Sequence, residues 1–136
     1  MSKHGAIPTL AYRNADKAIE FLVKALGFEA KNVYRDDDGH VMHAELQFGE
    51  AFIMLGTAEN KSDFGQLTRI PEEVGGHNTQ SPYFIVEEID NHYKNAVTHN
   101  AKIVMPIKDE DYGGRGYSCK DPEGYIWNFG TYSPYS

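Results

Sequence analysis

The chain lacks the features that mark secreted, membrane or zinc-binding proteins. It has one cysteine, Cys119, in 136 residues, so it can form no internal disulfide and offers no cysteine cluster to a structural zinc ion. The first residues, MSKHGAIPTL, contain no apolar run of the length that a signal peptide or a membrane span needs. We therefore expect a cytoplasmic protein without a membrane partner.

An excess of positive charge is also missing. The 13 lysine and arginine residues are outnumbered by 20 aspartate and glutamate residues, the formal net charge is -7, and the basic residues are scattered. Nucleic-acid binding requires a basic surface that neutralises phosphates, so we expect no nucleic-acid partner. The electrostatic field of an acidic protein favours neutral or cationic ligands.

What the sequence does contain is an internal repeat. A shift of 74 residues superposes residues 7–10 on 81–84 and residues 52–57 on 126–131. Between these segments a helical apolar pattern recurs in register: Ala15, Ile19, Leu22 and Val23 superpose on Ile89, Tyr93, Ala96 and Val97. The repeat predicts one domain of two β-α-β-β-β units, at residues 5–56 and 81–132, with a linker over 57–80.

Cap and turn residues divide each unit into five elements. The first unit is predicted to contain a strand at 7–12, a helix from the N-cap Asn14 to Gly27, and strands at 29–34, 41–48 and 51–55. The second is predicted to contain a strand at 82–86, a helix at 88–100, and strands at 102–105, 116–120 and 126–131. The polar linker is predicted to hold one helical turn, and loops of its length are often functional.

Strand alternation predicts one face covered by a helix and one open face of mixed chemistry. The two-residue turn at residues 49–50 pairs apolar residues on the covered face, where Phe84, Trp127 and Phe129 are also predicted to lie. The open face combines polar, aromatic and aliphatic groups, as ligand cavities do. The residues predicted to bind a ligand there are Thr9, His43, Glu45, Gln47, Phe52, Met54, Tyr83, Tyr117 and Asn128. Solvent or a second subunit could instead cover such a face.

The paired units, the segment YRNADKAIEFLVKALGFE and the late segment DPEGYIWNFG together resemble the vicinal oxygen chelate superfamily. That superfamily includes glyoxalase I, extradiol dioxygenases, fosfomycin resistance enzymes and bleomycin resistance proteins. The resemblance covers almost the entire chain, although Asp-Pro-Glu-Gly alone is a common turn sequence and adds little to it. It implies an α+β fold whose eight strands form a partly open barrel, with helices outside, the ligand inside, and a homodimer contributing to the cavity.

The resemblance also indicates which positions would hold a metal ion. Metal-dependent members place His, Glu or Gln ligands on the first and fourth strands of each unit, and the matching positions here are Ile7, Met54, Ser81 and Asn128. The first three offer neither imidazole nor carboxylate, and a lone asparagine amide is a weak ligand. We therefore predict no metal at these positions and no cofactor.

Catalytic candidates are few. His43 and Glu45 lie two residues apart on one strand face, where they could hold a displaced metal or form a hydrogen-bonded pair. Glu45 could act as an acid–base group if the cleft raises its pKa. Cys119 could approach His43 if both point inward, but a packed core cysteine is the simpler interpretation. His92, on the second helix, is expected to face solvent.

Two functions of different class follow. The first, typical of the bleomycin-resistance-like branch that the chain most resembles, is metal-free binding of an aromatic or cationic small molecule such as an antibiotic, without catalysis. The second is a glyoxalase-like lyase or isomerase that uses a displaced metal at His43 and Glu45, or acid–base chemistry at Glu45.

Overall fold

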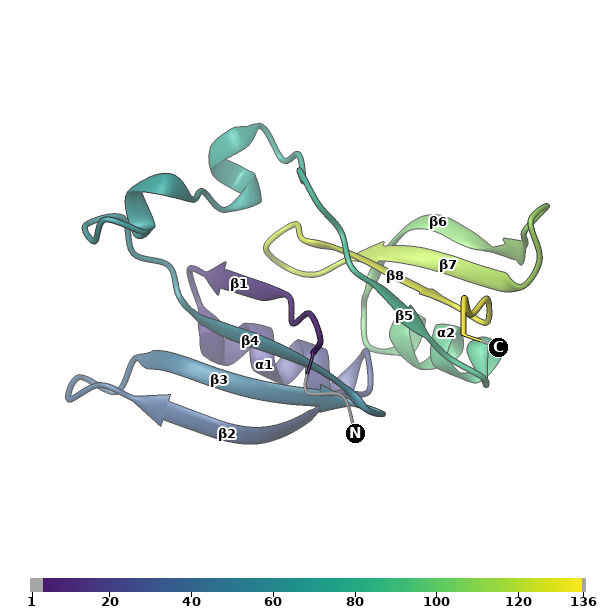
Figure 1. Ribbon diagram of the computed structural model, residues 1–136, viewed down its shortest axis with the longest axis horizontal. Helices are drawn as coiled ribbons and strands as arrows, with labels where there is room; N and C mark the ends of the chain where they lie inside the picture. The colour runs from purple at the N-terminus through teal and green to yellow at the C-terminus, as the bar shows by residue number, and fades with distance from the viewer. Residues whose placement is uncertain (1–3, 136) are drawn as a thin grey trace.

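The structure, a computed structural model, describes residues 4–135 and consists of two four-stranded sheets with one helix each (Figure 1). The first half contains β1 (Thr9–Tyr12), α1 (Ala15–Lys24), β2 (Glu29–Arg35), β3 (Val41–Phe48) and β4 (Ala51–Thr57). The second half contains β5 (Tyr83–Ile85), α2 (Ile89–Thr98), β6 (Lys102–Asp109), β7 (Arg115–Lys120) and β8 (Ile126–Gly130). The predicted α+β class is confirmed.

The linker and the helices differ little from expectation. The linker contains two short 3-10 helices, η1 (Gly65–Leu67) and η2 (Pro71–Val74), where one helical turn was predicted. Asn14 caps α1 as predicted, because its side-chain oxygen accepts the backbone N–H of Lys17 at 3.1 Å. Within residues 4–135, no helix is both long and apolar enough to cross a membrane.

Both sheets have the same strand order, β1-β4-β3-β2 and β5-β8-β7-β6. In each sheet the first strand pairs in parallel with the last, and Thr9 opposite Met54 corresponds to Tyr83 opposite Asn128 at the predicted shift of 74 residues. A common origin of the two halves remains a prediction.

The prediction that the eight strands form a partly open barrel is wrong. No strand of one sheet pairs with a strand of the other in the described part of the chain, so the sheets are not closed into a barrel. The edge strands β1 and β5 have only four and three residues, so each offers few backbone groups to a further strand.

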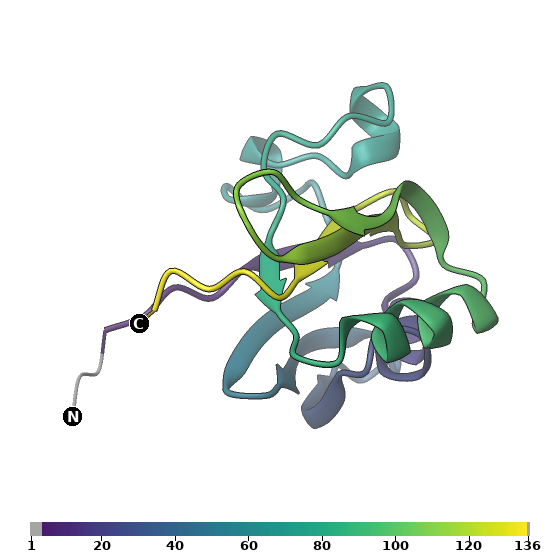
Figure 2. The ribbon, with the colours of Figure 1, turned by 90° about the vertical axis from the view of Figure 1, so that its right-hand side faces the viewer.

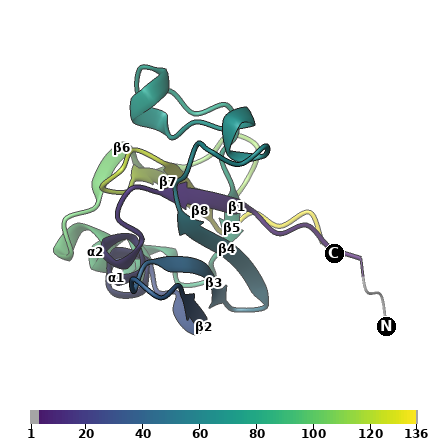
Figure 3. The ribbon, with the colours of Figure 1, turned by 90° about the vertical axis from the view of Figure 1, so that its left-hand side faces the viewer.

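A shared core on the helix side joins the two halves. Each helix contacts its own sheet, and the two helices lie on the same side of the molecule, opposite the side from which the chain ends emerge (Figures 2 and 3). The ring of Phe28, which follows α1, has its centroid 5.4 Å from that of Phe84 and 5.7 Å from that of Trp127. Phe84, Trp127 and Phe129 are buried, which confirms their predicted core position.

The turn between β7 and β8 binds the halves together through a buried carboxylate. Asp121 accepts hydrogen bonds from the Tyr12 hydroxyl at 2.6 Å and from the Trp127 indole N–H at 3.0 Å. The backbone N–H groups of Glu123 and Tyr125 also donate to it, each at 3.0 Å. Burial raises the pKa of Asp121, whereas these four donors act in the opposite direction.

Removing this carboxylate should destabilise the protein strongly. Asp121→Ala leaves the hydroxyl of Tyr12 and the indole N–H of Trp127 buried without an acceptor, and we expect a loss of about 3 kcal/mol in the free energy of unfolding. Urea unfolding followed by circular dichroism measures this loss. The control is Asp111→Ala, in the exposed β6–β7 turn, which should change stability by less than about 0.5 kcal/mol; equal losses would contradict the assignment.

His92 corrects a second expectation, because it faces the core and connects the halves. One ring nitrogen lies 2.8 Å from the carbonyl oxygen of Leu26 and the other lies 2.8 Å from the Tyr117 hydroxyl. Its ring centroid is 4.3 Å from that of Phe129. Burial lowers the pKa of His92, although the hydrogen bond to Leu26 opposes this effect.

This lowered pKa predicts a pH-dependent stability. As the pH falls through about 6.5, the unfolded state binds a proton at His92 before the folded state does, so folding stability should decrease. Urea unfolding between pH 7.5 and pH 5.5, values that span about one unit either side of the ordinary histidine pKa, should therefore show a shallower decrease for His92→Gln than for wild type. His99→Gln, on the exposed end of the same helix, controls for the loss of any histidine; an equally shallow profile in that control would refute the role of His92.

Candidate functional site

The open face of the first sheet carries a hydrogen-bonded polar cluster. Glu45 accepts from the side-chain amide of Asn32 at 2.9 Å and lies 3.0 Å from the His43 ring nitrogen Nε2. The ring of Tyr34 stacks on that of His43 at a centroid distance of 6.0 Å. The hydrogen bonds from His43 and Asn32 lower the pKa of Glu45, the opposite of the rise that acid–base chemistry at this residue would need.

The open face of the second sheet is hollowed into a pocket of about 340 Å³. Polar side chains form its floor, and they are hydrogen-bonded to other groups of the protein. The Ser118 hydroxyl donates to the side-chain oxygen of Asn128 at 2.6 Å, and the amide nitrogen of Asn128 donates to Ser81 Oγ and to the Pro82 carbonyl, each at 2.9 Å. A fixed floor of this kind orients a ligand through the remaining lone pairs of its oxygens.

The walls of this second-sheet pocket are aromatic. Tyr83, Tyr112 and Tyr132 line it together with Met105, and all four side chains are more than a third exposed. The rings of Tyr112 and Tyr132 meet edge to face with centroids 5.6 Å apart. Large exposed aromatic groups around a concavity are typical of a surface that binds another molecule.

The rim of the pocket is charged and partly neutralised. Lys108, Glu110 and Arg115 contribute to it. The guanidinium of Arg115 forms ion pairs with Asp90 at 3.2 Å and with Asp109 at 3.3 Å, so its charge is already shared with two carboxylates.

Tyr117 does not face the open side, contrary to expectation, whereas Cys119 is packed in the core, which was the simpler of its two interpretations. Tyr117 borders the pocket, but its side chain is 3% exposed and its hydroxyl bonds His92 in the core; Cys119 is 0% exposed. Burial raises the pKa of Cys119 to about 12, which keeps the thiol protonated. Cys119 therefore lies on the opposite face of its sheet from the side that could have met His43.

One inserted residue explains why the faces of β7 were predicted wrongly. Five residues, 121–125, separate the paired positions Lys120 and Ile126, whereas four residues, 48–51, separate the matching pair Gln47 and Phe52. The extra residue moves β7 by one position relative to the repeat, which exchanges its two faces. Ser118, rather than Cys119, consequently occupies the place of Glu45.

The remaining predicted ligand residues are divided between the two sheets. Tyr83 and Asn128 line the second-sheet pocket, as the strand pattern suggested. The others lie on the first sheet, outside that pocket: Thr9, His43, Glu45, Gln47, Phe52 and Met54. Four further lining residues were not predicted from the sequence, namely Met105, Tyr112, Ser118 and Tyr132. The available signal was the presence of two tyrosines in each of the segments 112–117 and 132–135.

The chemistry of the usual metal positions does not fit a divalent cation. Ile7 and Met54 offer no oxygen or nitrogen side-chain ligand, and the Asn128 oxygen already accepts the Ser118 hydroxyl. Within residues 4–135, the one group of three possible ligands with donor atoms close together is Asp36, Asp38 and His40, in the exposed β2–β3 turn. There Asp36 Oδ1 accepts two backbone N–H groups, which makes it part of the turn itself.

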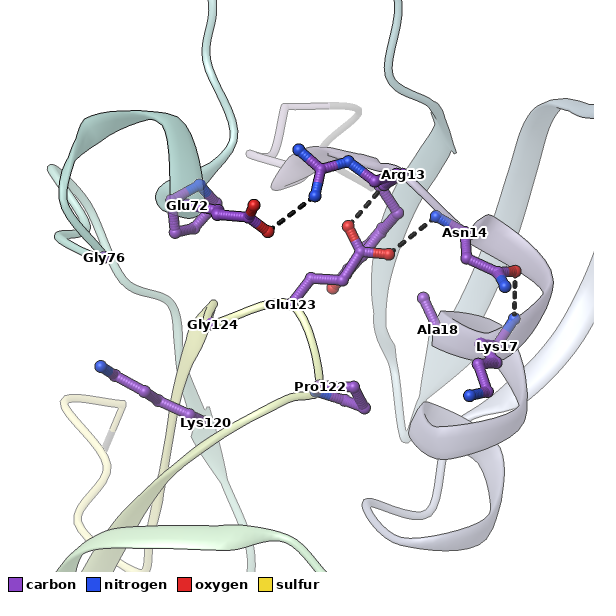
Figure 4. Close-up of a pocket in the computed structure, with 12 residues that line it drawn as sticks. Arg13, Asn14, Lys17, Ala18, Glu72, Gly76, Lys120, Pro122, Glu123 and Gly124 are labelled. Atoms are coloured by element: carbon purple, nitrogen blue, oxygen red, sulfur yellow. Dashed lines mark hydrogen bonds and ion pairs between the residues drawn. The ribbon is translucent and has the colours of Figure 1, made fainter.

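A larger cavity of about 490 Å³ lies between the start of α1, the linker helix η2 and the β7–β8 turn (Figure 4). Its charged groups are largely paired. Arg13 contacts Glu72 at 2.6 Å, and the Glu123 carboxylate accepts the backbone N–H groups of Arg13 and Asn14 at 2.6 and 2.8 Å. Lys17 and Lys120 also line the cavity, on opposite sides of Pro122 (Figure 4). No His, Cys, Ser or Thr belongs to its described lining, so it offers no imidazole, thiol or aliphatic hydroxyl group.

Comparison with known proteins identifies the family. A family model described as the Glyoxalase/Bleomycin resistance protein/Dioxygenase superfamily matches residues 6–129, and the chain belongs to this superfamily. The uncharacterized protein Rv0887c of Mycobacterium tuberculosis is 29% identical over 125 residues, which cover 90% of this chain and 71% of that protein.

Solved structures agree in fold. TioX from Micromonospora sp. ML1 superposes with a TM-score of 0.73 at 25% identity, covering 98% of this chain and 99% of that one. The fosfomycin resistance protein FosX from Mesorhizobium loti gives a TM-score of 0.64 at 12% identity, covering 98% and 96%. At this identity FosX supports the fold alone.

The Glu45 cluster can be tested by NMR titration. In wild type, the carboxyl carbon of Glu45 should titrate below the ordinary glutamate value of about 4.3. His43→Ala removes the hydrogen bond that contributes most to this lowering, so the midpoint should rise. Gln47→Ala, on the same strand face, is the control; an unchanged midpoint in His43→Ala would show that the pair does not form in solution.

Proposed function

We propose that this protein binds an aromatic or cationic small molecule, such as an antibiotic, without a metal and without transforming it. The observation that supports this function best is the second-sheet pocket with its three tyrosines and its polar floor. Its volume of about 340 Å³ lies within the range of roughly 300–1,000 Å³ for small-molecule sites. Tyrosine faces attract both flat rings and cations.

The donor set supports the metal-free part of the proposal. The matched positions Ile7, Met54, Ser81 and Asn128 carry no imidazole or carboxylate, and the floor amide of Asn128 is already hydrogen-bonded on both sides. A lowered pKa at Glu45 also gives little support to acid–base chemistry there. Sequestration needs only shape, stacking and charge, which this surface supplies.

Family membership and charge point the same way. The family description includes bleomycin resistance proteins. The net charge of -7 favours cations over anions near the surface. Drug resistance by binding is therefore consistent with both the family description and the electrostatics.

We further propose that a second copy of the chain completes the site. Aromatic and apolar side chains on both open faces remain more than a third exposed, among them Tyr34, Tyr83, Ile85 and Met105. Two open sheets with such faces can cover one another in a homodimer and enclose a ligand between them.

Thermal-shift measurements test the function. Bleomycin and planar aromatic cations at a hundredfold excess over the dissociation constant should stabilise the folded state by about 2.7 kcal/mol, seen as a rise of several degrees in Tm. Tyr83→Ala should reduce the rise, whereas Phe64→Ala, an exposed aromatic in the linker, should retain it.

Elemental analysis and light scattering complete the experiment. We expect a preparation without a stoichiometric divalent metal and a mass of two chains. A stoichiometric metal that disappears in His43→Ala would replace the proposal by the metal-dependent one, and no thermal response across the panel would count against binding.

A further inference from the structure

The side chain of Tyr83 lies over the neighbouring strand β8 instead of projecting perpendicular to its own strand, β5. Its backbone is opposite Asn128, but the phenol end of its ring reaches diagonally over Gly130, two residues further along β8. A Cβ built on Gly130 would lie 2.7 Å from the hydroxyl oxygen of Tyr83 and 3.1 Å from its Cε1 atom. The position of the ring is thus compatible with glycine at residue 130 and with no larger residue.

The hydroxyl group holds the ring in this place. It donates a hydrogen bond to the carbonyl oxygen of Tyr132 at 2.8 Å. Tyr83 nevertheless remains 42% exposed and lines the second-sheet pocket. One side of the ring therefore rests on β8 while the rest is available to a ligand.

The first half shows that this arrangement is not a general requirement of the fold. Gly56 occupies the place of Gly130 there, but a Cβ on Gly56 would meet the backbone oxygen of Met42 at 2.6 Å. At Gly130 the three nearest atoms all belong to Tyr83. The residue equivalent to Tyr83 is Thr9, which has no ring. Gly130 therefore leaves room for a neighbouring side chain, whereas Gly56 leaves room for neighbouring backbone.

We propose that Gly130 is a positioning residue that fixes the Tyr83 ring as a flat wall of the pocket, and that this wall selects planar aromatic ligands. The inference rests on the proposed binding function and adds its selectivity. A ring that is held flat before binding loses little conformational freedom when a planar ligand stacks on it. A non-planar ligand of the same charge cannot lay an extended flat surface on the ring, so it gains less from this contact.

The test combines fluorine NMR with binding of two monovalent cations, planar ethidium and non-planar tetraphenylphosphonium. The protein is labelled with 3-fluorotyrosine, and the Tyr83 resonance is assigned as the one missing in Tyr83→Phe. In Gly130→Ala this resonance should move. Ethidium binding should weaken roughly tenfold, as expected for loss of one aromatic contact, and tetraphenylphosphonium binding should weaken much less.

A double-mutant cycle separates positioning from a general structural effect. In a Tyr83→Ala background, Gly130→Ala should weaken ethidium binding no further, because the ring that it displaces is absent. Should Gly130→Ala fail to fold, Tyr83→Phe, labelled at its remaining tyrosines, removes the anchor to Tyr132 and should still weaken ethidium selectively.

The outcomes are distinguishable. A Tyr83 resonance that does not move in Gly130→Ala overturns the proposal, as does an equal loss of both cations or a loss that persists without Tyr83. If wild type binds neither cation but the resonance moves, the proposed binding of planar cations fails while the positioning of Tyr83 by Gly130 is supported.

Discussion

A buried carboxylate on the β7–β8 turn is the interaction on which the arrangement of the two halves depends. An ionised group in a protein interior is tolerated only when donors surround it, and Asp121 receives four, from β1, from β8 and from its own turn. All four exist together only when these segments have their observed positions. Glu123, in the same turn, adds a cap to the chain entering α1. The turn that appeared to carry little information in the sequence is thus the main polar contact between the halves.

Because the halves are joined at this turn and through the aromatic core beside the helices, strand pairing is not needed to hold them together. The two sheets accordingly stay separate in the described part of the chain, and side chains on both open faces stay exposed. The packing of Phe28 against Phe84 and Trp127 fixes the helix side rigidly. The opposite side, where we propose that a ligand binds, can therefore vary in chemistry without loss of the fold.

The sequence was a good guide wherever periodicity alone decides the structure. Hairpin register at Phe48 and Ala51, the N-cap Asn14 and the buried Trp127 all follow from alternation and local chemistry. It failed where one inserted residue changes a face, as at Tyr117, and where burial comes from the other half, as at His92. The sequence also did not predict the tyrosine pocket, because Tyr112 and Tyr132 meet only through the folded β6–β7 turn. Contacts of this kind depend on tertiary placement, which no local pattern encodes.

The two open faces share a backbone frame but differ in charge. Glu45, opposite Met54, is a carboxylate whose lowered pKa keeps it anionic at neutral pH. Ser118, opposite Asn128, is a neutral hydroxyl beside tyrosine rings. If a second copy brings these faces together, a ligand between them meets a flat aromatic surface on one side and a negative charge on the other. That combination suits an aromatic cation, for which net charge alone would be a much weaker argument.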